Sequence, residues 1–221
     1  MQVGRLSPLQ TRVLHELAGL EPSWTLSGGG ALVGFHTQHR ETRDLDLFWQ
    51  GRRELGALAT QVASTLRTAG LAVDVLQTEL SFARLSVRDV DGETVLVDLV
   101  ADPVPLAEAP REVLLEGRAL RVDTPHQILV NKLCAMLTRS EVRDLRDVDA
   151  LIGIGGDLAR AVEDAPGQDM GFSAITLAWT LRRWPLGKLA AALGESAAEV
   201  ASLDAMREKI VERLLVLAVP Q

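Results

Sequence analysis

Acidic side chains recur at fixed spacing inside one apolar segment of the sequence. Asp44 and Asp46 lie two residues apart in residues 42–49, where alternating polarity predicts a β-strand. Side chains at i and i+2 of a strand project from one face, so both carboxylates point the same way while Leu45 and Leu47 face the core. Two like charges held together cost free energy unless a cation offsets them, and oxygen ligands suit Mg²⁺ or Mn²⁺. We therefore predict a divalent metal site at Asp44 and Asp46; the alternative is a solvated strand end.

A third acidic residue lies in a later predicted strand. Asp98 falls within residues 93–100, between Val97 and Leu99, which face the opposite way. A lone carboxylate in an apolar strand requires a partner. If this strand neighbours residues 42–49, three carboxylates gather around one or two metal ions, which is the arrangement for in-line phosphoryl transfer. The alternative is an ion pair between Asp98 and a nearby arginine.

Three consecutive glycines, residues 28–30, follow a short predicted strand and precede a helix-like run. The run is not a P-loop, because Phe35 and His36 replace the required lysine and hydroxyl residue. It is not a dinucleotide fingerprint either, because Val33 replaces the third glycine. The free amides and the positive dipole end of a helix N-terminus can still hold an anion. The alternative is a tight strand-to-helix turn without a ligand.

The elements around these residues divide the chain into two parts. Up to about residue 122, strands alternate with helices, and Asp91-Gly92 and Glu116-Gly117 predict two β-hairpins. From Thr124-Pro125, an N-cap with proline at the first helical position, the pattern is helical. We predict an α/β domain at residues 1–122 and a helical domain at 123–221. The expected strands are 24–27, 42–49, 71–75, 82–88, 93–100, 113–115 and 119–122; the expected helices are 7–17, 55–69, 124–139, 141–151, 157–163, 173–184, 186–193 and 197–217.

Composition limits the compartment and the kind of partner. The chain has 221 residues, is 47% hydrophobic, and contains neither an apolar run long enough for a membrane span nor a signal-peptide pattern. The single cysteine, Cys134, excludes an internal disulfide and fits a core thiol in a reducing cytoplasm. A net charge of −7 argues against a protein that coats nucleic acid non-specifically, although a local basic groove remains compatible with it.

Several of these motifs together resemble a known family. A glycine pair, a short helix, an Asp-x-Asp strand and a later hydrophobic-Asp-hydrophobic strand are similar to the polymerase beta-like nucleotidyltransferase superfamily. More narrowly, residues 39–48, HRETRDLDLF, and residues 132–151, KLCAMLTRSEVRDLRDVDAL, resemble the AbiEii/AbiGii toxin family. The resemblance covers roughly residues 24–151. It implies an α+β fold, with a nucleotidyltransferase-like mixed β-sheet and flanking helices, followed by a C-terminal helical bundle.

The resemblance also implies a reaction and roles for individual residues. The reaction is transfer of a nucleoside monophosphate from an NTP to an acceptor, with release of pyrophosphate. The triphosphate is held by glycines, whereas the wider superfamily has Gly-Ser at this position. Asp98 completes the metal site and helps to deprotonate the acceptor hydroxyl. The implied residues are Gly29 and Gly30 for triphosphate, Asp44, Asp46 and Asp98 for metal, Lys132 for phosphate, and Asp147 in the C-terminal motif.

Other charged residues near these motifs have two interpretations each. Arg40 and Arg43 flank the acidic strand and either neutralise triphosphate charge or form structural ion pairs. Lys132 borders an apolar stripe and, apart from the resemblance, is equally well a surface lysine that lies along that stripe. Arg143 and Asp147 have the spacing of an ordinary surface ion pair on a helix.

Three functions remain open from the sequence. The leading hypothesis is a metal-dependent nucleotidyltransferase of the AbiEii-like toxin type, for which the resemblance implies the 3′ end of tRNA as acceptor and a cognate antitoxin as partner. The alternatives are nucleotidylation of an aminoglycoside or lincosamide antibiotic, and a nucleotide-binding or antitoxin-like module without catalysis. Arg182, Arg183 and Trp184 are interpreted as a helix-end cluster, with a base-stacking and phosphate-binding patch as the alternative.

Overall fold

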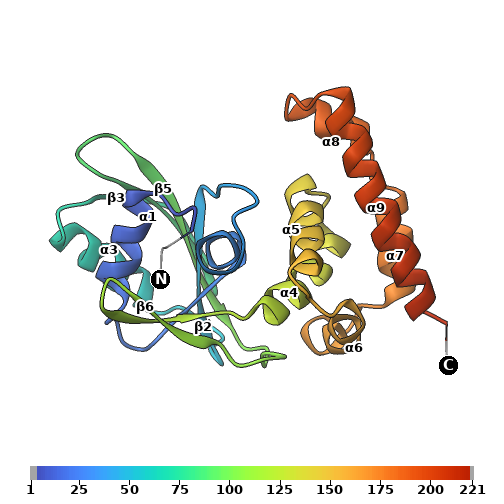
Figure 1. Cartoon of the computed structure of the whole chain (residues 1–221). Coiled ribbons are helices and arrows are strands. Elements are labelled where there is room, and N and C mark those ends of the chain that lie inside the picture. The colour runs from blue at the N-terminus through green and yellow to red at the C-terminus, as the bar shows by residue number, and fades with distance from the viewer. Residues whose placement is uncertain (1–3, 220–221) are drawn as a thin grey trace. The chain divides into compact units, whose positions relative to one another are not determined.

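The computed structural model describes residues 4–219 (Figure 1). The chain forms two compact units, which divide between Thr124 and Pro125, and each unit is described by itself. Among the described residues, no helix combines the length and the apolar character that a membrane crossing requires.

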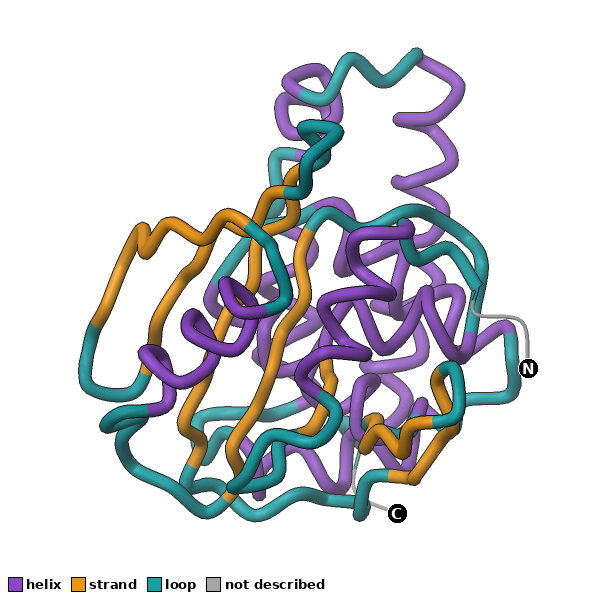
Figure 2. The backbone as a smooth tube through the Cα atoms, turned by 90° about the vertical axis from the view of Figure 1, so that its left-hand side faces the viewer, coloured by secondary structure: helices purple, strands orange, loops and turns teal. Residues whose placement is uncertain are grey.

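A seven-stranded mixed sheet forms the centre of the first unit, as Figure 2 shows in orange. Its strand order is β3-β4-β5-β2-β1-β7-β6. The β2–β5 and β1–β7 pairs are parallel, and all other neighbours are antiparallel. The mixed sheet expected from the sequence is therefore confirmed. The strands are β1 (Thr25–Ser27), β2 (Asp44–Gln50), β3 (Ala72–Thr78), β4 (Phe82–Arg88), β5 (Thr94–Asp102), β6 (Arg111–Leu115) and β7 (Arg118–Val122).

Both predicted hairpins are present, for a reason visible in their backbone angles. Gly92, in the turn between β4 and β5, has φ +87°. Between β6 and β7, Glu116 and Gly117 have φ +48° and +84°. Tight antiparallel turns require such left-handed backbone, which glycine adopts without a steric penalty.

Helices flank this sheet. The helices α1 (Pro8–Leu17) and α3 (Leu58–Thr68) cover one face of it, as Figures 1 and 2 both show. Ser7 and Gln10 form a capping box that begins α1. The glycine run begins α2 (Gly28–Ala31), which continues directly as the π-helical segment η1 (Leu32–His36). The glycines therefore directly follow β1 and form the first turn of a continuous helical stretch, whereas the sequence predicted that they precede the helix.

The second unit is entirely helical across its described residues, as the helical pattern predicted. One helix differs from expectation: α6 was expected to end at 163 but continues through Pro166 to Gln168. Ala161 and Ala165 are fully buried, and α6 packs against α4. This tertiary packing stabilises the helix beyond Pro166 and offsets the low helix propensity of proline. The helices are α4 (Pro125–Thr138), α5 (Val142–Gly153), α6 (Leu158–Gln168), α7 (Ala174–Arg182), α8 (Leu186–Ala192) and α9 (Ala197–Leu217).

Candidate active site

A row of polar side chains crosses the centre of the sheet. Arg84 on β4 lies opposite Asp98 on β5, Asp98 is in register with Asp46 on β2, and Asp46 lies opposite Ser27 on β1. Residues in register on adjacent strands present their side chains to the same face. The sequence predicted that the three carboxylates gather only if the strand of Asp98 lies next to the strand of Asp44 and Asp46. These two strands are indeed neighbours, and Asp98 lies directly beside Asp46.

Asp98 has an arginine partner. The Nε and Nη2 atoms of Arg84 donate to Oδ1 and Oδ2 of Asp98 at 2.7 and 2.6 Å. Asp98 is only 6% exposed, so the ion pair satisfies a carboxylate that is otherwise buried. The hydrogen bonds to Asp98 raise the pKa of Arg84, and the charges of Asp44 and Asp46 add to this effect. The Arg84 guanidinium is thus the ion-pair partner of Asp98 and lies within the electrostatic influence of Asp44 and Asp46.

The two carboxylates of β2 are half-buried and alternate with fully buried leucines, as predicted. Oδ1 of Asp44 accepts a hydrogen bond from the Thr42 hydroxyl at 2.6 Å. Asp46 lies against the glycine turn, because a Cβ atom on Gly28 would be only 2.1 Å from Oδ2 of Asp46. Gly28 also has φ +61°, which other residues rarely adopt. Both the backbone angle and the space require glycine at this position.

The next two glycines also lie close to side chains, although less closely than Gly28. A Cβ on Gly29 would lie 2.9 Å from the Thr42 hydroxyl and 3.0 Å from Nη2 of Arg40. Arg40 is therefore held beside the glycine turn, whereas Arg43 is exposed. A Cβ on Gly30 would lie 3.0 Å from Leu45, so that glycine lets the helix approach β2 closely.

The suitability of this group for a metal ion rests on its donor atoms. Asp44, Asp46 and Asp98 offer the oxygen ligands that Mg²⁺ and Mn²⁺ prefer. Within residues 4–219, however, no three acidic, histidine or cysteine side chains are arranged ready to hold an ion. Both Asp98 oxygens accept hydrogen bonds from Arg84. The carboxylate chemistry of Asp44, Asp46 and Asp98 fits the metal, while Asp98 is held in an ion pair.

Asp123, which the sequence interpretation missed, extends the polar row. Val122 on β7 is in register with Leu26 on β1, and the Asp123 amide donates to the Leu26 carbonyl at 2.9 Å, so Asp123 lies level with Ser27. Its side chain is fully buried, and neither carboxylate oxygen has a hydrogen-bond partner among the described residues. Burial raises the pKa of Asp123 to about 6, and the nearby Ser27 hydroxyl and Arg121 oppose this shift without satisfying either oxygen. No local sequence pattern marks this residue.

The Lys-Leu-x-Ala and Arg-Asp-x-x-Asp motifs form a charge cluster inside the second unit. Nζ of Lys132 lies 2.7 Å from Oδ1 of Asp144 and 2.7 Å from Oδ2 of Asp147. Arg139 also donates to both Asp144 oxygens, at 2.8 and 3.0 Å. Both aspartates are fully buried and Lys132 is 7% exposed. The interpretations of Lys132 as a surface lysine and of Asp147 as a surface ion-pair residue are therefore wrong.

Opposing effects act on the Asp144 carboxyl. Burial alone would raise its pKa, but the hydrogen bonds from Arg139 and Lys132 and their positive charges outweigh burial and lower the pKa below its usual value. Asp144 is therefore ionised, which makes the cluster a set of buried charges that depend on one another.

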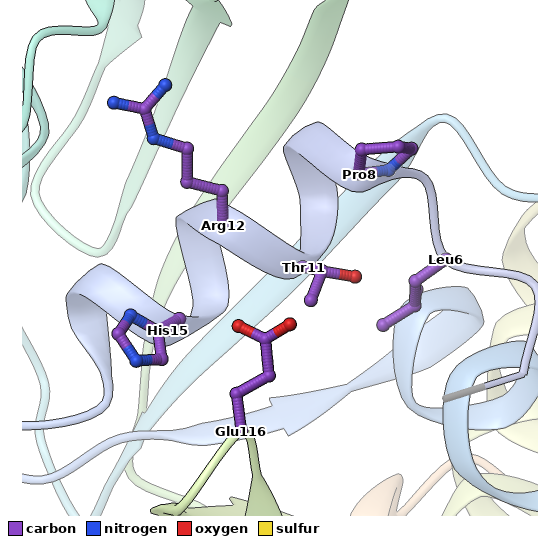
Figure 3. Close-up of a pocket in the computed structure, with 6 residues that line it drawn as sticks. All are labelled: Leu6, Pro8, Thr11, Arg12, His15 and Glu116. Atoms are coloured by element: carbon purple, nitrogen blue, oxygen red, sulfur yellow. The ribbon is translucent and has the colours of Figure 1, made fainter. Parts of the chain in front are cut away.

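Two cavities of the first unit lie beside α1 or the residues just before it. One of about 450 Å³ lies between α1 and the β6–β7 turn, where Figure 3 shows the Glu116 carboxylate pointing toward α1 between Thr11 and His15. It contains none of the predicted site residues. Another, of about 320 Å³, is lined by Thr42, the hydroxyl partner of Asp44, together with residues near the start of α1.

Solved structures share this architecture. MenT4, a nucleotidyltransferase toxin from Mycobacterium tuberculosis H37Rv, superposes with a TM-score of 0.55 at 17% identity, over 96% of this chain and 91% of that one. A candidate nucleotidyltransferase from H. pylori gives a TM-score of 0.53 at 21% identity, over 97% of this chain and 100% of that one. A nucleotidyltransferase-like antigenic protein from Paracoccidioides brasiliensis gives 0.51 at 17% identity, over 85% and 93%. At these identities the likeness establishes the fold.

The sequence itself settles the family. No curated protein sequence matches the chain. The family model described as "Nucleotidyl transferase AbiEii toxin, Type IV TA system" matches residues 12–206, which include the glycine turn, the three sheet carboxylates and the Lys132 cluster. Because this match spans most of the chain, the protein belongs to the AbiEii family of nucleotidyltransferase toxins and is a nucleotidyltransferase.

Proposed function

We propose that the protein transfers a nucleoside monophosphate from an NTP to the 3′ end of a tRNA and thereby blocks translation in the cytoplasm. The observation that carries the proposal is the row formed by Arg84, Asp98, Asp46 and Ser27 beside the glycine turn. It combines carboxylates for a metal–triphosphate complex, a base for the acceptor hydroxyl and free amides for an anion. The resemblance of the sequence motifs to the AbiEii/AbiGii toxin family supports tRNA as the acceptor.

In the proposed reaction, the acceptor 3′-hydroxyl oxygen attacks the α-phosphorus of the NTP. A new oxygen–phosphorus bond forms, and the bond from the α-phosphorus to the bridging oxygen of the β-phosphate breaks. Pyrophosphate leaves with that electron pair, and the hydroxyl proton passes to the Asp98 carboxylate. Asp98 is placed for this role because it is in register with Asp46 on the neighbouring strand.

We propose that Asp44 and Asp46 hold Mg²⁺ or Mn²⁺, and that Asp98 joins them when Arg84 releases it. When bound, the metal neutralises phosphate charge and favours ionisation of the attacking hydroxyl. Thr42 positions Asp44 through its 2.6 Å hydrogen bond. Gly28 provides the space that Asp46 occupies. These contacts orient both carboxylates before any ligand arrives.

The glycine turn and the basic residues beside it would hold the triphosphate. The amides of Gly29 and Gly30 begin a helical stretch whose dipole favours negative charge. Arg40 lies against Gly29 and is placed to contact a phosphate there. Arg43 is exposed at the start of β2 and would add long-range attraction only.

The second unit contributes Lys132 and Asp147 in this proposal. The resemblance to the family is the support for a phosphate contact by Lys132 and for a role of Asp147 in the C-terminal motif. Within the second unit, Asp144 and Asp147 hold the Lys132 ammonium group at 2.7 Å each. We further propose a cognate antitoxin as the cellular partner, because the family description refers to type IV toxin–antitoxin systems.

The test is transfer of label from each of the four α-labelled NTPs in the presence of Mg²⁺, with and without total tRNA. We expect one or more NTPs to label tRNA at its 3′ end. Asp46→Asn should reduce labelling by at least about a thousandfold, because one carboxylate of the metal site is lost. The matched control is Asp74→Asn, an exposed aspartate on the edge strand β3, which should retain full labelling.

Other results would point away from tRNA. Labelling of an aminoglycoside but not of tRNA would contradict the proposed acceptor and favour the antibiotic-modifying alternative. Equal labelling by wild type and Asp46→Asn would show that the proposed carboxylate group is not the catalytic site. Digestion of labelled tRNA with a 3′ exonuclease would establish where the nucleotide was added.

A further inference from the structure

Basic residues in the second unit divide into paired and unpaired groups. Most have an acidic partner within 4 Å: Lys132, Arg139, Arg143, Arg146, Arg160, Arg207 and Lys209. Among the described residues, Arg182, Arg183, Lys188 and Arg213 form no such ion pair. Three of these unpaired cations fall within seven residues of one another, at the end of α7 and the start of α8.

This region also lacks negative charge along the sequence. Residues 170–194 contain no aspartate or glutamate, the longest such stretch in the chain, and they include Arg182, Arg183 and Lys188. All three side chains are exposed. A local excess of positive charge in a protein whose net charge is −7 is the electrostatic pattern of an anion-binding surface.

An exposed tryptophan lies on the same helix face. Trp179 is 64% exposed, whereas Trp24, Trp49 and Trp184 are 5% exposed or less. Arg182 and Arg183 follow Trp179 at i+3 and i+4, which places both on its side of α7 one turn later. The opposite face of α7, with Leu177, Ala178 and Leu181, is buried and packs against α9 (Figure 1).

The aromatic residue of this surface is not the one that the sequence indicated. Trp184 is 5% exposed and belongs to the core, so the patch formed by Arg182, Arg183 and Trp184 cannot stack a base. Trp179 takes that place. The Trp179 ring is exposed to solvent, and the guanidinium groups of Arg182 and Arg183 form no ion pair among the described residues. Such a surface fits a ligand with flat bases that stack on the ring and phosphates that contact the guanidinium groups.

We propose that the face of α7 formed by Trp179, Arg182 and Arg183 binds a single-stranded segment of the RNA acceptor. A base stacks on the Trp179 indole, and the two guanidinium groups contact the flanking phosphates. Stacking on an aromatic side chain is tolerant of sequence because every base has a flat face. This inference rests on the proposed function for the identity of the acceptor, but RNA binding can be measured without any transfer.

The experiment measures binding of a fluorescent single-stranded 12-nucleotide RNA, and of total tRNA, by anisotropy in the absence of NTP. Trp179→Ala should weaken binding about tenfold, and Trp179→Phe should restore most of it because a ring is again present. Arg182→Ala/Arg183→Ala should weaken binding and make the slope of log affinity against log salt shallower by about 1.4, since two phosphate contacts are lost.

A matched control separates the effect of this surface from the effect of losing two positive charges anywhere on the protein. Arg52→Ala/Arg53→Ala removes another exposed pair of adjacent arginines, in the first unit, and should change RNA affinity less than about twofold. Equal losses for the two double variants would overturn the proposal. Unchanged RNA affinity of Trp179→Ala would overturn it as well.

The experiments distinguish failure of the proposed tRNA transfer from failure of the proposed RNA-binding surface on α7. If Asp46→Asn and wild type bind the RNA equally but neither labels it, the tRNA-transfer proposal fails while the α7 surface stands. If wild type labels tRNA, and the α7 variants bind and label it as well as wild type at limiting RNA, the α7 surface fails while transfer stands.

Discussion

The guanidinium of Arg84 and the carboxylate of Asp98 form two parallel hydrogen bonds, of 2.7 and 2.6 Å, across neighbouring strands of the sheet. The pair puts a cation beside three carboxylates at the position where the proposed metal would otherwise supply the positive charge. Arg84 is 40% exposed at its side chain, so it can leave toward solvent, whereas Asp98 is fixed in the sheet. If the proposed metal binds, it would therefore compete with Arg84 for the Asp98 carboxylate.

Replacement of Arg84 should expose this competition. In Arg84→Met, Asp98 loses its ion-pair partner, so we expect Mn²⁺ to bind on the order of tenfold more tightly than to wild type. The metal-free variant should also be less stable, with stability regained when Mn²⁺ is added. Free Mn²⁺ measured by electron paramagnetic resonance gives the affinity directly, without reference to catalysis. Arg88→Met, an exposed arginine on the same strand, is the control and should leave Mn²⁺ affinity unchanged. Equal affinities in all three proteins would refute the competition.

The contact between Gly28 and Asp46 gives a second prediction. In Gly28→Ala the new Cβ would lie 2.1 Å from Oδ2 of Asp46, so the carboxylate must move. We expect nucleotide transfer and Mn²⁺ binding to be lost together, along with about 1–2 kcal/mol of stability from the left-handed backbone. Gly51→Ala separates the two effects, because Gly51 has φ +74° and no atom within 4 Å of the added Cβ. It should lose similar stability but keep transfer. Loss of transfer in both variants would assign the effect to backbone strain alone.

The buried cluster around Lys132 should respond strongly to loss of its lysine. Lys132→Met leaves Asp144 and Asp147 with Arg139 as the main remaining cation. We therefore expect the free energy of unfolding, measured in urea, to fall by about 3–5 kcal/mol. Lys209→Met is matched in chemistry but removes only a 3.2 Å contact to Asp149 from an exposed side chain, and should cost less than about 1 kcal/mol. A similar small cost in both variants would show that the cluster is not a structural element. Transfer assays on Lys132→Met are informative only at temperatures where the variant remains folded.

Local patterns predicted the parts of the site that depend on local geometry. Asp44 and Asp46 share a face because side chains alternate along any strand, and the hairpins follow from Gly92 and Gly117. The sequence did not predict that β2 and β5 are neighbours, because parallel pairing joins strands that are far apart in the sequence. The prediction of three gathered carboxylates therefore depended on an unproved assumption. The resemblance to a family supplied the link between these motifs and nucleotide transfer.

Residues whose environment depends on distant contacts were interpreted less well. The sequence left Lys132 equally well a surface lysine or a phosphate-binding one, because its own helix shows only an apolar stripe. Its acidic partners come from α5, which is a different helix. Asp98 was expected to have a metal or an unspecified arginine, because the register that selects Arg84 is a property of the assembled sheet. Asp123 carried no signal at all, since its burial arises only when β7 pairs with β1.

That burial makes Asp123 a source of pH-dependent stability. The native carboxyl has a pKa of about 6, and the unfolded one has the ordinary value of 3.8. Between these values the native state binds more protons than the unfolded state, so stability is fully present below about pH 4 and falls as the pH rises through 6. A shift of about two pH units corresponds to about 3 kcal/mol. In Asp123→Asn this decline should disappear, so the variant should gain stability relative to wild type from pH 4 to 7 and keep that gain at higher pH. Urea unfolding at intervals across this range gives the difference, and Asp74→Asn, an exposed aspartate on β3, should follow wild type throughout. A constant difference between Asp123→Asn and wild type at every pH would mean that the pKa of Asp123 is the same in the native and unfolded states.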